Sequence, residues 1–315
     1  MINFGKGLKS MGIPLPDGGR FTSPWSTTYF IDGDSGNDSN NGKSPTAAFK
    51  TIQGAFNKAT GGDVIYIKPK TYTLGTGFAR YTEDVSVTLG GAGGSGATAT
   101  NANISLIGIS PCKVPNDFLG VRWKYATATN LTVDAPGLHI ENIGFFSEDA
   151  TYAINLRNNG ATRTREGTTG FSIYNCAIKG DGKLYADGGN ELQIVSCRFQ
   201  CKYDGTVGGI NLVGSNNQVV RAIIRDCDFI GGNANNMSDA AIIGAAPWYD
   251  ALIRDCYFLA ESDTGEYINI SGSNTGMVAN CYFGSADIGT DSIVASGMIG
   301  VGCYDDDGVQ AAPIA

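Results

Sequence analysis

The chain has 315 residues, 45 of them glycine, with 17% charged residues and a formal net charge of −8 at pH 7. This negative charge speaks against nucleic-acid binding, which depends mostly on lysine and arginine contacts to phosphate. No apolar stretch approaches the roughly 20 residues that cross a bilayer, and no apolar core of a secretory signal follows Lys6 and Lys9. We therefore expect neither a nucleic acid nor a membrane as a partner.

Residues 1–28 are expected to form an extended N-terminal arm. Prolines and scattered glycines oppose regular structure there, yet the segment carries several large apolar side chains: Phe4, Leu8, Ile13, Leu15, Phe21 and Trp25. One interpretation is a strand-like segment that lies on its own domain. The other is an arm that docks on a neighbouring subunit or a larger assembly through these apolar residues.

A strand at Tyr29–Ile31 and a turn rich in aspartate, asparagine and glycine follow the arm. Asp32, Asp34 and Asp38 could supply oxygen ligands to Ca²⁺, although the downstream glutamate of an EF-hand loop is missing. Aspartate and asparagine also build turns by bonding to their own backbone. We favour a structural turn, keep Ca²⁺ as the weaker alternative, and expect no other cofactor.

A helix is predicted to begin at Ser44 and Pro45, which suit the N-cap and the first helical position. Apolar residues recur at helical spacing and form one face: Phe49, Ile52, Phe56 and Ala59. Gly61 and Gly62 end the helix. Residues 29–62 thus comprise a strand, a turn and a helix, and the helix is expected to cover the open end of a repetitive domain.

One six-residue pattern recurs through residues 63–303: apolar, any, Asn/Asp/Ser, Cys, any, apolar. Its polar position holds Asn175, Ser196, Asp226, Asp255 and Asn280, and its next position holds Cys176, Cys197, Cys227, Cys256 and Cys281. An earlier copy has Asn142 followed by isoleucine. Repeats about 20 to 35 residues apart indicate a solenoid or a propeller.

The parity of apolar residues within the pattern favours the solenoid. Ile224 and Phe229 fall on opposite faces of a continuous strand, so both can reach one core only if the chain bends at Asp226. A strand, a one-residue corner and a second strand are the cross-section of a parallel β-helix. We predict an all-β fold, a parallel β-helix of about eight coils over residues 63–303, and a short C-terminal tail at residues 304–315.

The repeated cysteines are interpreted as buried thiols that act as small apolar side chains. Parallel strands set them about 4.8 Å apart, with parallel Cβ vectors that suit a disulfide poorly. Stacked thiols of this kind do not converge on a tetrahedral metal site.

The stretch from Tyr29 to Tyr72, which contains YFIDGDSGNDSNNGKSP and GGDVIYIKPKTY, resembles the opening of right-handed parallel β-helix proteins of the pectate-lyase-like superfamily. The polar corner positions resemble the asparagine ladder of that superfamily, and the resemblance covers about residues 29 to 300. It implies the right-handed parallel β-helix fold. It implies little about activity, because the superfamily holds lyases, hydrolases, adhesins and virion proteins.

The catalytic motifs of that superfamily are not found in the sequence. Its lyases need a Ca²⁺ carboxylate cluster with a basic residue, and its hydrolases need paired aspartates and a Gly-His-Gly turn. The only histidine, His139, stands in Gly-Leu-His-Ile-Glu and is expected on the surface. The best carboxylate cluster is Asp226, Asp228 and Asp255, which we interpret as a solvated ladder beside Arg225 and Arg254. No catalytic residue is assigned, and a non-enzymatic protein is favoured.

Outward-facing positions offer two candidate contact surfaces. Trp248, Tyr249, Tyr257 and Tyr282 could stack on glycan rings or form a subunit contact, and the subunit contact is favoured. Three strands that precede copies of the pattern are expected to leave an asparagine outward, namely Asn155, Asn211 and Asn269.

Two functions remain open. The opening segment resembles that of bacteriophage-encoded β-helix proteins, which implies a non-enzymatic structural protein of the virion, assembled in the host cytoplasm. This would be a capsid decoration or minor head protein, homo-oligomeric with a trimer favoured, and anchored to the major capsid protein or another virion protein through its arm. The alternative is a tailspike-like protein that binds or depolymerises a host surface glycan. Twenty-eight residues are too few for a separate head-binding domain, which favours the first function.

Overall fold

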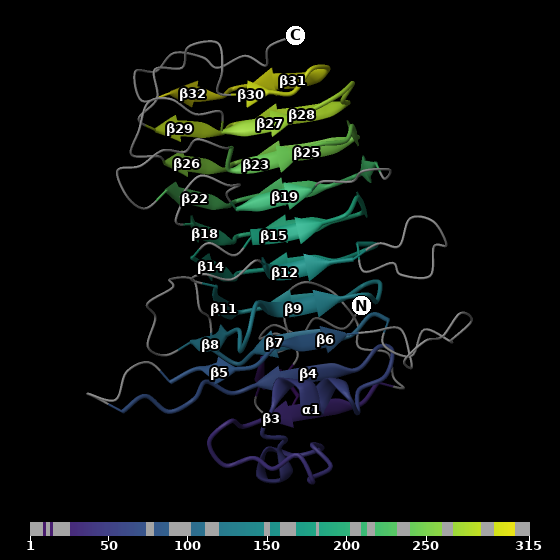
Figure 1. Cartoon of the computed structure of the whole chain (residues 1–315), viewed down its shortest axis with the longest axis vertical. Helices are drawn as coiled ribbons and strands as arrows, with labels where there is room; N and C mark the ends of the chain where they lie inside the picture. Colours follow the sequence, from purple (N-terminus) through teal and green to yellow (C-terminus); the bar gives the residue numbers. More distant parts are fainter. Residues whose placement is uncertain are drawn as a thin grey trace.

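The computed structural model describes residues 9–10, 13–14, 26–73, 79–87, 102–110, 120–147, 152–157, 168–180, 183–201, 209–212, 218–231, 240–259, 267–284 and 293–305. Within these residues the chain winds into a column of stacked parallel strands, with early strands at one end and late strands at the other (Figure 1). The predicted right-handed parallel β-helix is confirmed.

Three parallel sheets form the walls of the solenoid. Sheet 1 contains β3 (Thr28–Ile31), β4 (Val64–Ile67), β7 (Ser105–Gly108), β10 (His139–Glu141), β13 (Ser172–Tyr174), β17 (Gln193–Val195), β21 (Ile223–Arg225), β25 (Ala251–Arg254), β28 (Gly276–Ala279) and β31 (Met298–Val301). Sheet 2 contains β5 (Tyr81–Thr82), β8 (Val121–Lys124), β11 (Ile143–Phe146), β14 (Ala177–Lys179), β18 (Arg198–Cys201), β22 (Asp228–Gly231), β26 (Tyr257–Leu259), β29 (Tyr282–Gly284) and β32 (Tyr304–Asp305).

Sheet 3 contains β6 (Val85–Val87), β9 (Thr129–Val133), β12 (Tyr152–Leu156), β15 (Lys183–Ala186), β19 (Ile210–Leu212), β23 (Ile242–Gly244), β27 (Ile268–Ile270) and β30 (Ile293–Val294). A small sheet joins β16 (Gly189–Asn190), β20 (Val219–Val220) and β24 (Trp248–Tyr249). Near the N-terminus, β1 (Lys9–Ser10) pairs antiparallel with β2 (Ile13–Pro14). The helical elements are a 3₁₀ turn at Pro45–Ala47 and α1 (Ile52–Phe56).

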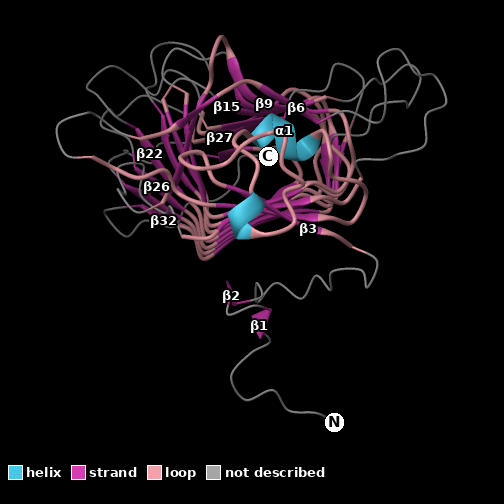
Figure 2. Ribbon diagram, turned by 90° about the horizontal axis from the view of Figure 1, so that it is seen from below, coloured by secondary structure: helices cyan, strands magenta, loops and turns pink. Residues whose placement is uncertain are grey.

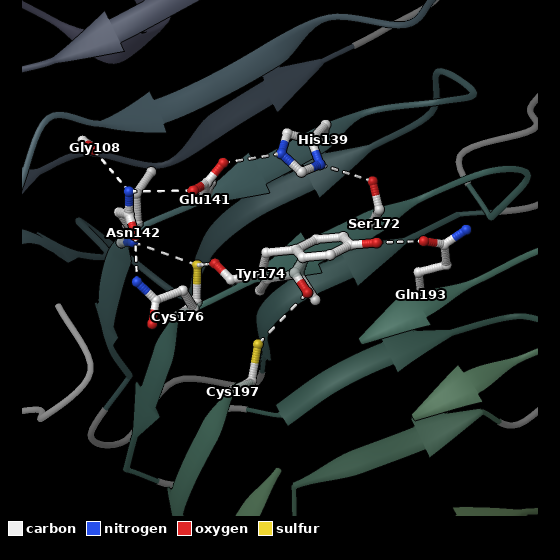
Figure 3. Close-up of polar contacts among 12 residues, drawn as sticks. Gly108, His139, Glu141, Asn142, Ser172, Tyr174, Cys176, Gln193 and Cys197 are labelled. Carbon is white, nitrogen blue, oxygen red and sulfur yellow. Dashed lines mark hydrogen bonds and ion pairs between the residues drawn. The ribbon is translucent and has the colours of Figure 1, made fainter. Parts of the chain in front are cut away.

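Each coil passes from sheet 1 through a one-residue corner to sheet 2 and then to sheet 3. The corner residues all have left-handed backbone geometry, with φ of 61° at Asn142, 51° at Asn175, 52° at Ser196, 55° at Asp226, 53° at Asp255 and 53° at Asn280. Asparagine and aspartate tolerate this conformation better than most residues. Their side chains also bond along the column: Asn175 Nδ2 donates to Asn142 Oδ1, and Asn142 Nδ2 donates to the Gly108 carbonyl at 3.2 Å (Figure 3).

The side chains that follow each corner fill the core. On sheet 2, consecutive rings of Phe199, Phe229, Phe258 and Phe283 stack with centroid distances of 4.9, 4.7 and 4.9 Å. Beside them lies a column of buried free thiols: Cys176, Cys197, Cys227, Cys256, Cys281 and Cys303. Cys303 continues the repeated cysteine position by one coil.

A second column of left-handed residues was not predicted. Glu191, Arg221 and Asp250 have φ of 59°, 55° and 53°, and each lies five residues before a corner of the first column. Gly137 and Gly170, with φ of 71° and 63°, occupy the same offset in earlier coils. The constant spacing of five residues was a readable signal, but glutamate and arginine are not typical of left-handed positions.

The expected continuous helix from Pro45 to Ala59 is wrong. The 3₁₀ turn ends at Ala47, and Phe49 then lies extended beside β3, where its N–H donates to the Phe30 carbonyl at 2.9 Å. Phe49, whose spacing suited a helix, is therefore hydrogen-bonded to the edge of the sheet. A separate short helix, α1, begins after Thr51, whose hydroxyl accepts the Gly54 N–H.

The solenoid extends beyond the expected residues 63–303 at both ends. β3 falls in the segment expected to precede the solenoid, yet it is an outer strand of sheet 1 and pairs with β4. At the other end, β32 pairs with β29, so the first two residues of the expected tail belong to sheet 2. Each of the two segments is hydrogen-bonded to the edge of a neighbouring strand.

Helix α1 lies across the N-terminal end of the solenoid (Figure 2), and its Ile52, Ala55 and Phe56 are buried in the main core. Glu83, in the turn between β5 and β6, accepts the backbone N–H groups of Ile52 and Gln53 at 2.9 and 3.0 Å. Its carboxylate therefore holds the first turn of the helix against the first coil. Burial raises the pKa of Glu83, and these two hydrogen bonds offset part of the effect.

This raised pKa predicts how stability depends on pH. The folded protein binds the Glu83 proton more tightly than the unfolded chain, so its contribution is complete below the ordinary glutamate pKa and is lost as pH rises through the raised value. The free energy of unfolding of the wild type, relative to Glu83→Gln, should therefore fall as pH rises from the ordinary glutamate pKa through the raised value. Urea unfolding of both proteins across this range measures it.

Asp84 is the matched control for this experiment. Burial alone would raise its pKa, but hydrogen bonds from the Thr127 hydroxyl and from nearby backbone N–H groups lower the pKa of Asp84 overall. Its contribution is present above the ordinary aspartate pKa and is lost as pH falls. The wild type relative to Asp84→Asn should thus show the opposite slope, and equal slopes for the two variants would contradict the assignment.

Candidate functional site

The outer face of sheet 1 has a polar centre that contains the only histidine. His139 Nδ1 lies 2.9 Å from Ser172 Oγ, and His139 Nε2 lies 3.5 Å from Glu141 Oε2 (Figure 3). The Tyr174 hydroxyl donates to Gln193 Oε1 on the next strand. The histidine is less exposed than expected, with 12% of its side chain accessible.

These residues include the hydroxyl, imidazole and carboxylate of a serine hydrolase, but they lack the groups that would hold an oxyanion. The backbone N–H groups of His139, Ser172 and Gln193 donate to carbonyls of the neighbouring strands at 2.9, 3.0 and 2.9 Å. Ser172 itself is only 2% exposed. We interpret the cluster as a set of hydrogen bonds that satisfies polar groups on an otherwise packed face.

The three aspartates of the Asp-rich turn are engaged separately. Burial alone would raise the pKa of Asp32, but the hydrogen bond from Lys68 Nζ at 2.8 Å and two backbone N–H groups lower it. The other two carboxylates accept hydrogen bonds from different parts of the chain, Asp34 from Thr71 and Asp38 from Thr51. Within the described residues, no group of three or more histidine, cysteine, aspartate or glutamate side chains could hold a metal ion.

The predicted charge ladder lies on the outside of the corner. Arg225 and Arg254 are in register on β21 and β25, and each forms an ion pair at 3.0 Å with the corner aspartate that follows it, Asp226 or Asp255. Asp228 is exposed on β22. Asp226 and Asp255 are thus paired with arginines on the surface.

The aromatic candidates separate into two groups. Tyr257 and Tyr282 are in register on sheet 2 and stack at 5.0 Å with an interplanar angle of 4°. Each ring therefore covers one face of the other, and Tyr257 is 38% exposed. The preference for a subunit contact over a glycan contact at this pair stays a prediction.

The assignment of Trp248 to the surface is wrong. It is fully buried, and a Cβ at Gly244 would lie 2.5 Å from its Nε1, so the glycine makes room for the indole. The left-handed residue Asp250 turns the chain between β24 and β25, so Trp248 does not continue the alternation of β25. Its neighbour Tyr249 is half-buried.

The outer face of sheet 3 carries the most distinctive polar column. Asn155, Asn211 and Asn269 lie in it, together with Thr132 and Tyr185, because they share one register position. Hydroxyl, amide and phenol groups thus follow one another at the spacing of the strands from Thr132 to Asn211, and the apolar Ile243 separates Asn269 from them.

Asn211 is the unusual member of this column. Only 5% of the residue is exposed, and its Oδ1 has no hydrogen-bond donor among the described residues. A buried amide oxygen without a donor is costly, and such groups in native proteins usually serve a ligand or an ordered water. The column therefore holds a buried acceptor without a donor in the described part of the chain.

Tyr185 is the register neighbour of Asn211, and its ring lies against that of Tyr152 on the strand beyond. Tyr152 and Tyr185, on adjacent strands, have ring centroids 4.9 Å apart and are tilted by 40°, and Lys183 Nζ lies 5.7 Å from the Tyr152 centroid. Burial, followed by Asp187 and Tyr152, raises the pKa of Tyr185, so its hydroxyl stays protonated and able to donate.

Three charged residues continue this face at the ends of consecutive strands. Asp134, Arg157 and Asp187 each follow directly on the last inward residue of β9, β12 and β15, which are in register. Arg157 Nε lies 3.7 Å from Asp134 Oδ1. The two aspartates are two strands apart, which corresponds to about 10 Å along the axis.

Sequence reasoning placed the three asparagines outward, but it missed Tyr185 and the column of Asp134, Arg157 and Asp187. In the sequence, each of these residues stands within or directly after a short stretch of alternating apolar residues. This becomes recognisable once the strands are aligned. The long and unequal connections between strands hide that alignment. The burial of Asn211 could not be predicted, since it depends on segments far apart in the chain.

The apolar side chains that were predicted to anchor the arm are not among the described side chains. Phe4, Leu8, Leu15, Phe21 and Trp25 lie outside the described residues, as does the side chain of Ile13 in β2. In the described part of the chain, no helix has the length and apolar character needed to span a membrane.

No protein-family model matches the chain, and no curated protein matches its sequence. Among solved structures, pectin methylesterase from carrot is 12% identical over 94% of this chain and 88% of that one, with a TM-score of 0.49. A pectate lyase is 14% identical over 92% and 79%, with a TM-score of 0.44. A rhamnogalacturonan lyase is 15% identical over 89% and 74%, with a TM-score of 0.40. At these identities and scores, the likeness says nothing about chemistry.

Proposed function

We propose that the protein binds a polysaccharide along the outer face of sheet 3. The observation that carries the proposal is Asn211, a nearly buried amide whose Oδ1 has no donor among the described residues. A sugar hydroxyl is a donor of the right kind, and asparagine side chains with two or more bonding groups suit the paired hydroxyls of a sugar ring.

The surroundings of Asn211 support the same ligand class. Tyr152 and Tyr185 offer ring surface with a polar edge, which suits the mixed apolar and hydroxyl character of a sugar. Asn155 and Asn269 repeat the amide on other strands of the same column. A ligand made of repeating units matches a face made of repeating strands, so a linear glycan fits better than a single small molecule.

Binding without cleavage is the activity that we propose. Asp134 and Asp187 lie about 10 Å apart along the axis, near the upper end of the separation used by inverting glycosidases. However, Arg157 lies between them in the register and contacts Asp134. The pair therefore suits positioning of a charged or polar ligand better than acid–base catalysis.

The experiment compares the wild type with Asn211→Leu on a panel of neutral and acidic polysaccharides, by calorimetry and by retardation in gels that contain the glycan. We expect at least about a tenfold loss of affinity in the variant, as for one lost buried hydrogen bond. The variant should also be slightly more stable in urea, because the unsatisfied amide is replaced by an apolar group of similar size. Assays for new reducing ends and unsaturated uronates report cleavage.

Gln193→Leu is the matched control, since it removes an amide from the outer face of sheet 1. It should bind glycans as the wild type does. If no polysaccharide binds the wild type, or if Asn211→Leu binds as tightly as the wild type, glycan recognition on this face is wrong.

We also propose a second function, that of a structural subunit of a larger particle. Of the six exposed large apolar residues in the described part of the chain, five lie on the last strands of sheets 1 and 2: Tyr257, Met277, Ile299, Val301 and Tyr304. They flank one corner of the solenoid and form a stripe along its axis. A second copy in parallel orientation would present the same residues at the same strand spacing, so the stripe suits a homo-oligomer such as a trimer.

This second function includes the proposal that the protein is a decoration or minor head protein of a bacteriophage virion, anchored by residues 1–28 to the major capsid protein. Deletion of residues 1–20 should leave a folded β-helix that no longer co-sediments with the particle. Circular dichroism and sedimentation test both halves of this expectation. Unimpaired attachment of the truncated protein would exclude the arm as the anchor.

A further inference from the structure

The core contains a feature that neither proposed function uses. Six consecutive coils each contribute one buried free thiol to a single column: Cys176, Cys197, Cys227, Cys256, Cys281 and Cys303. Each of these residues is 2% exposed or less. The sulfur atoms of this column make a chemistry available that alanine or valine in the same positions would not.

The sulfur atoms repeat with the strands because their contacts repeat. Each Sγ lies close to the carbonyl oxygen two residues before it, at 3.2 Å for Cys176, Cys227 and Cys256, 3.3 Å for Cys197, 3.4 Å for Cys281 and 3.7 Å for Cys303. Several also approach a carbonyl of the preceding coil, as Cys197 does at 3.6 Å to Ile173. Side chains in one shared orientation have sulfurs that are separated by the strand spacing of about 4.8 Å.

Two common fates of neighbouring thiols do not suit this spacing. A disulfide needs Cβ atoms about 3.5–4.5 Å apart, whereas parallel Cβ vectors on adjacent strands keep about 4.8 Å. A tetrahedral metal site needs ligands that converge, and within the described residues no group of three or more suitable side chains does so. The column is therefore expected to remain as thiols under mild oxidation.

A linear two-coordinate ion is different. Two metal–sulfur bonds of about 2.3 Å, placed end to end, span about 4.6 Å, which is close to the strand spacing. We propose that successive pairs of the column bind a thiophilic, linearly coordinated divalent cation, for which Hg²⁺ is the probe. Two S–H bonds break, two Hg–S bonds form, and two protons leave for each ion.

Charge selects a divalent ion over a monovalent one. Two thiolates and one Hg²⁺ make a neutral unit, which an apolar core accepts. Two thiolates with Ag⁺ or Cu⁺ leave one negative charge in the core, and burying an uncompensated charge is strongly unfavourable. Because a neutral unit uses each thiolate once, six thiols in a row bind three ions.

The number of ions bound by cysteine variants shows whether binding requires thiols on adjacent coils or only a given number of thiols. Cys112 and the side chain of Cys201 lie outside the described residues, so both are first changed to alanine in every protein. In this background, Cys197→Ala with Cys256→Ala leaves only Cys281 and Cys303 adjacent and should bind one ion. Cys176→Ala with Cys303→Ala also keeps four thiols, but these are contiguous and should bind two ions.

The measurement is mercury per chain after prolonged incubation with HgCl₂ and desalting, with proton release followed in weak buffer and folding followed by circular dichroism. We expect three ions per chain for the parent, one for Cys197→Ala with Cys256→Ala and two for Cys176→Ala with Cys303→Ala. We also expect two protons per ion and a higher melting temperature when mercury links the coils. If the first double variant does not fold, Cys227→Ala with Cys281→Ala replaces it, because it also leaves one adjacent pair. Equal mercury in variants with four thiols, or none in the folded parent, would overturn the proposal.

Discussion

Replacing Phe229 by alanine is expected to lower the free energy of unfolding by about 3 to 5 kcal/mol. The ring is fully buried and stacks on Phe199 at 4.9 Å and on Phe258 at 4.7 Å, within 6° of parallel. Its loss removes buried apolar area and leaves a cavity between two rings that are held in place by their own strands. Urea unfolding followed by far-ultraviolet circular dichroism measures the change.

Tyr257→Ala is the control for this substitution. Tyr257 is also stacked, on Tyr282, but it stands outside the solenoid and is 38% exposed. Its truncation should cost less than about 1 kcal/mol, because little area is buried and no cavity forms. Similar losses for the two variants would mean that stacking along the axis, rather than burial in the core, provides most of the stability of these rings.

Replacing Asn175 by valine is expected to cost about 2 to 3 kcal/mol. With φ of 51°, this corner is left-handed, and a β-branched residue is strongly disfavoured there. The substitution also removes the hydrogen bond from Asn175 Nδ2 to Asn142 Oδ1. The same unfolding measurement applies, and the loss should appear without a change in the fold of the remaining coils.

Asn175→Gly separates the two contributions. Glycine adopts positive φ without a steric penalty, so this variant loses the amide bond but keeps the corner. We expect a cost of about 1 kcal/mol or less. If glycine were as damaging as valine, the hydrogen bonds of the ladder, and not the backbone geometry of the corner, would be the dominant contribution.

The corner residues show why much of the fold could be predicted. Asn175 and Asp226 stand between apolar residues of opposite parity, and that parity forces a bend whatever the rest of the chain does. The tolerance of asparagine and aspartate for left-handed geometry is likewise a property of one residue. Local rules of this kind repeat in every coil, so each copy of the pattern strengthens the same conclusion.

The helix and Trp248 show where local rules fail. Phe49 has helical spacing, but the backbone of β3 offers hydrogen bonds that hold it extended. Trp248 has outward parity only if the chain runs straight to β25, and the turn at Asp250 makes it buried. The position of Phe49 is decided by a strand and that of Trp248 by a bend. Neither belongs to the local apolar spacing from which the position was predicted.

The sequence by itself determined the solenoid, its corners and its inward cysteines, because these depend on alternation and on backbone preference within about six residues. Only the tertiary structure decided the candidate glycan face. Tyr185, Asn211 and the column of Asp134, Arg157 and Asp187 are brought together by parallel register across connections of unequal length. Register between distant strands, and the burial of a single amide oxygen, are properties of the assembled sheets and of no short segment.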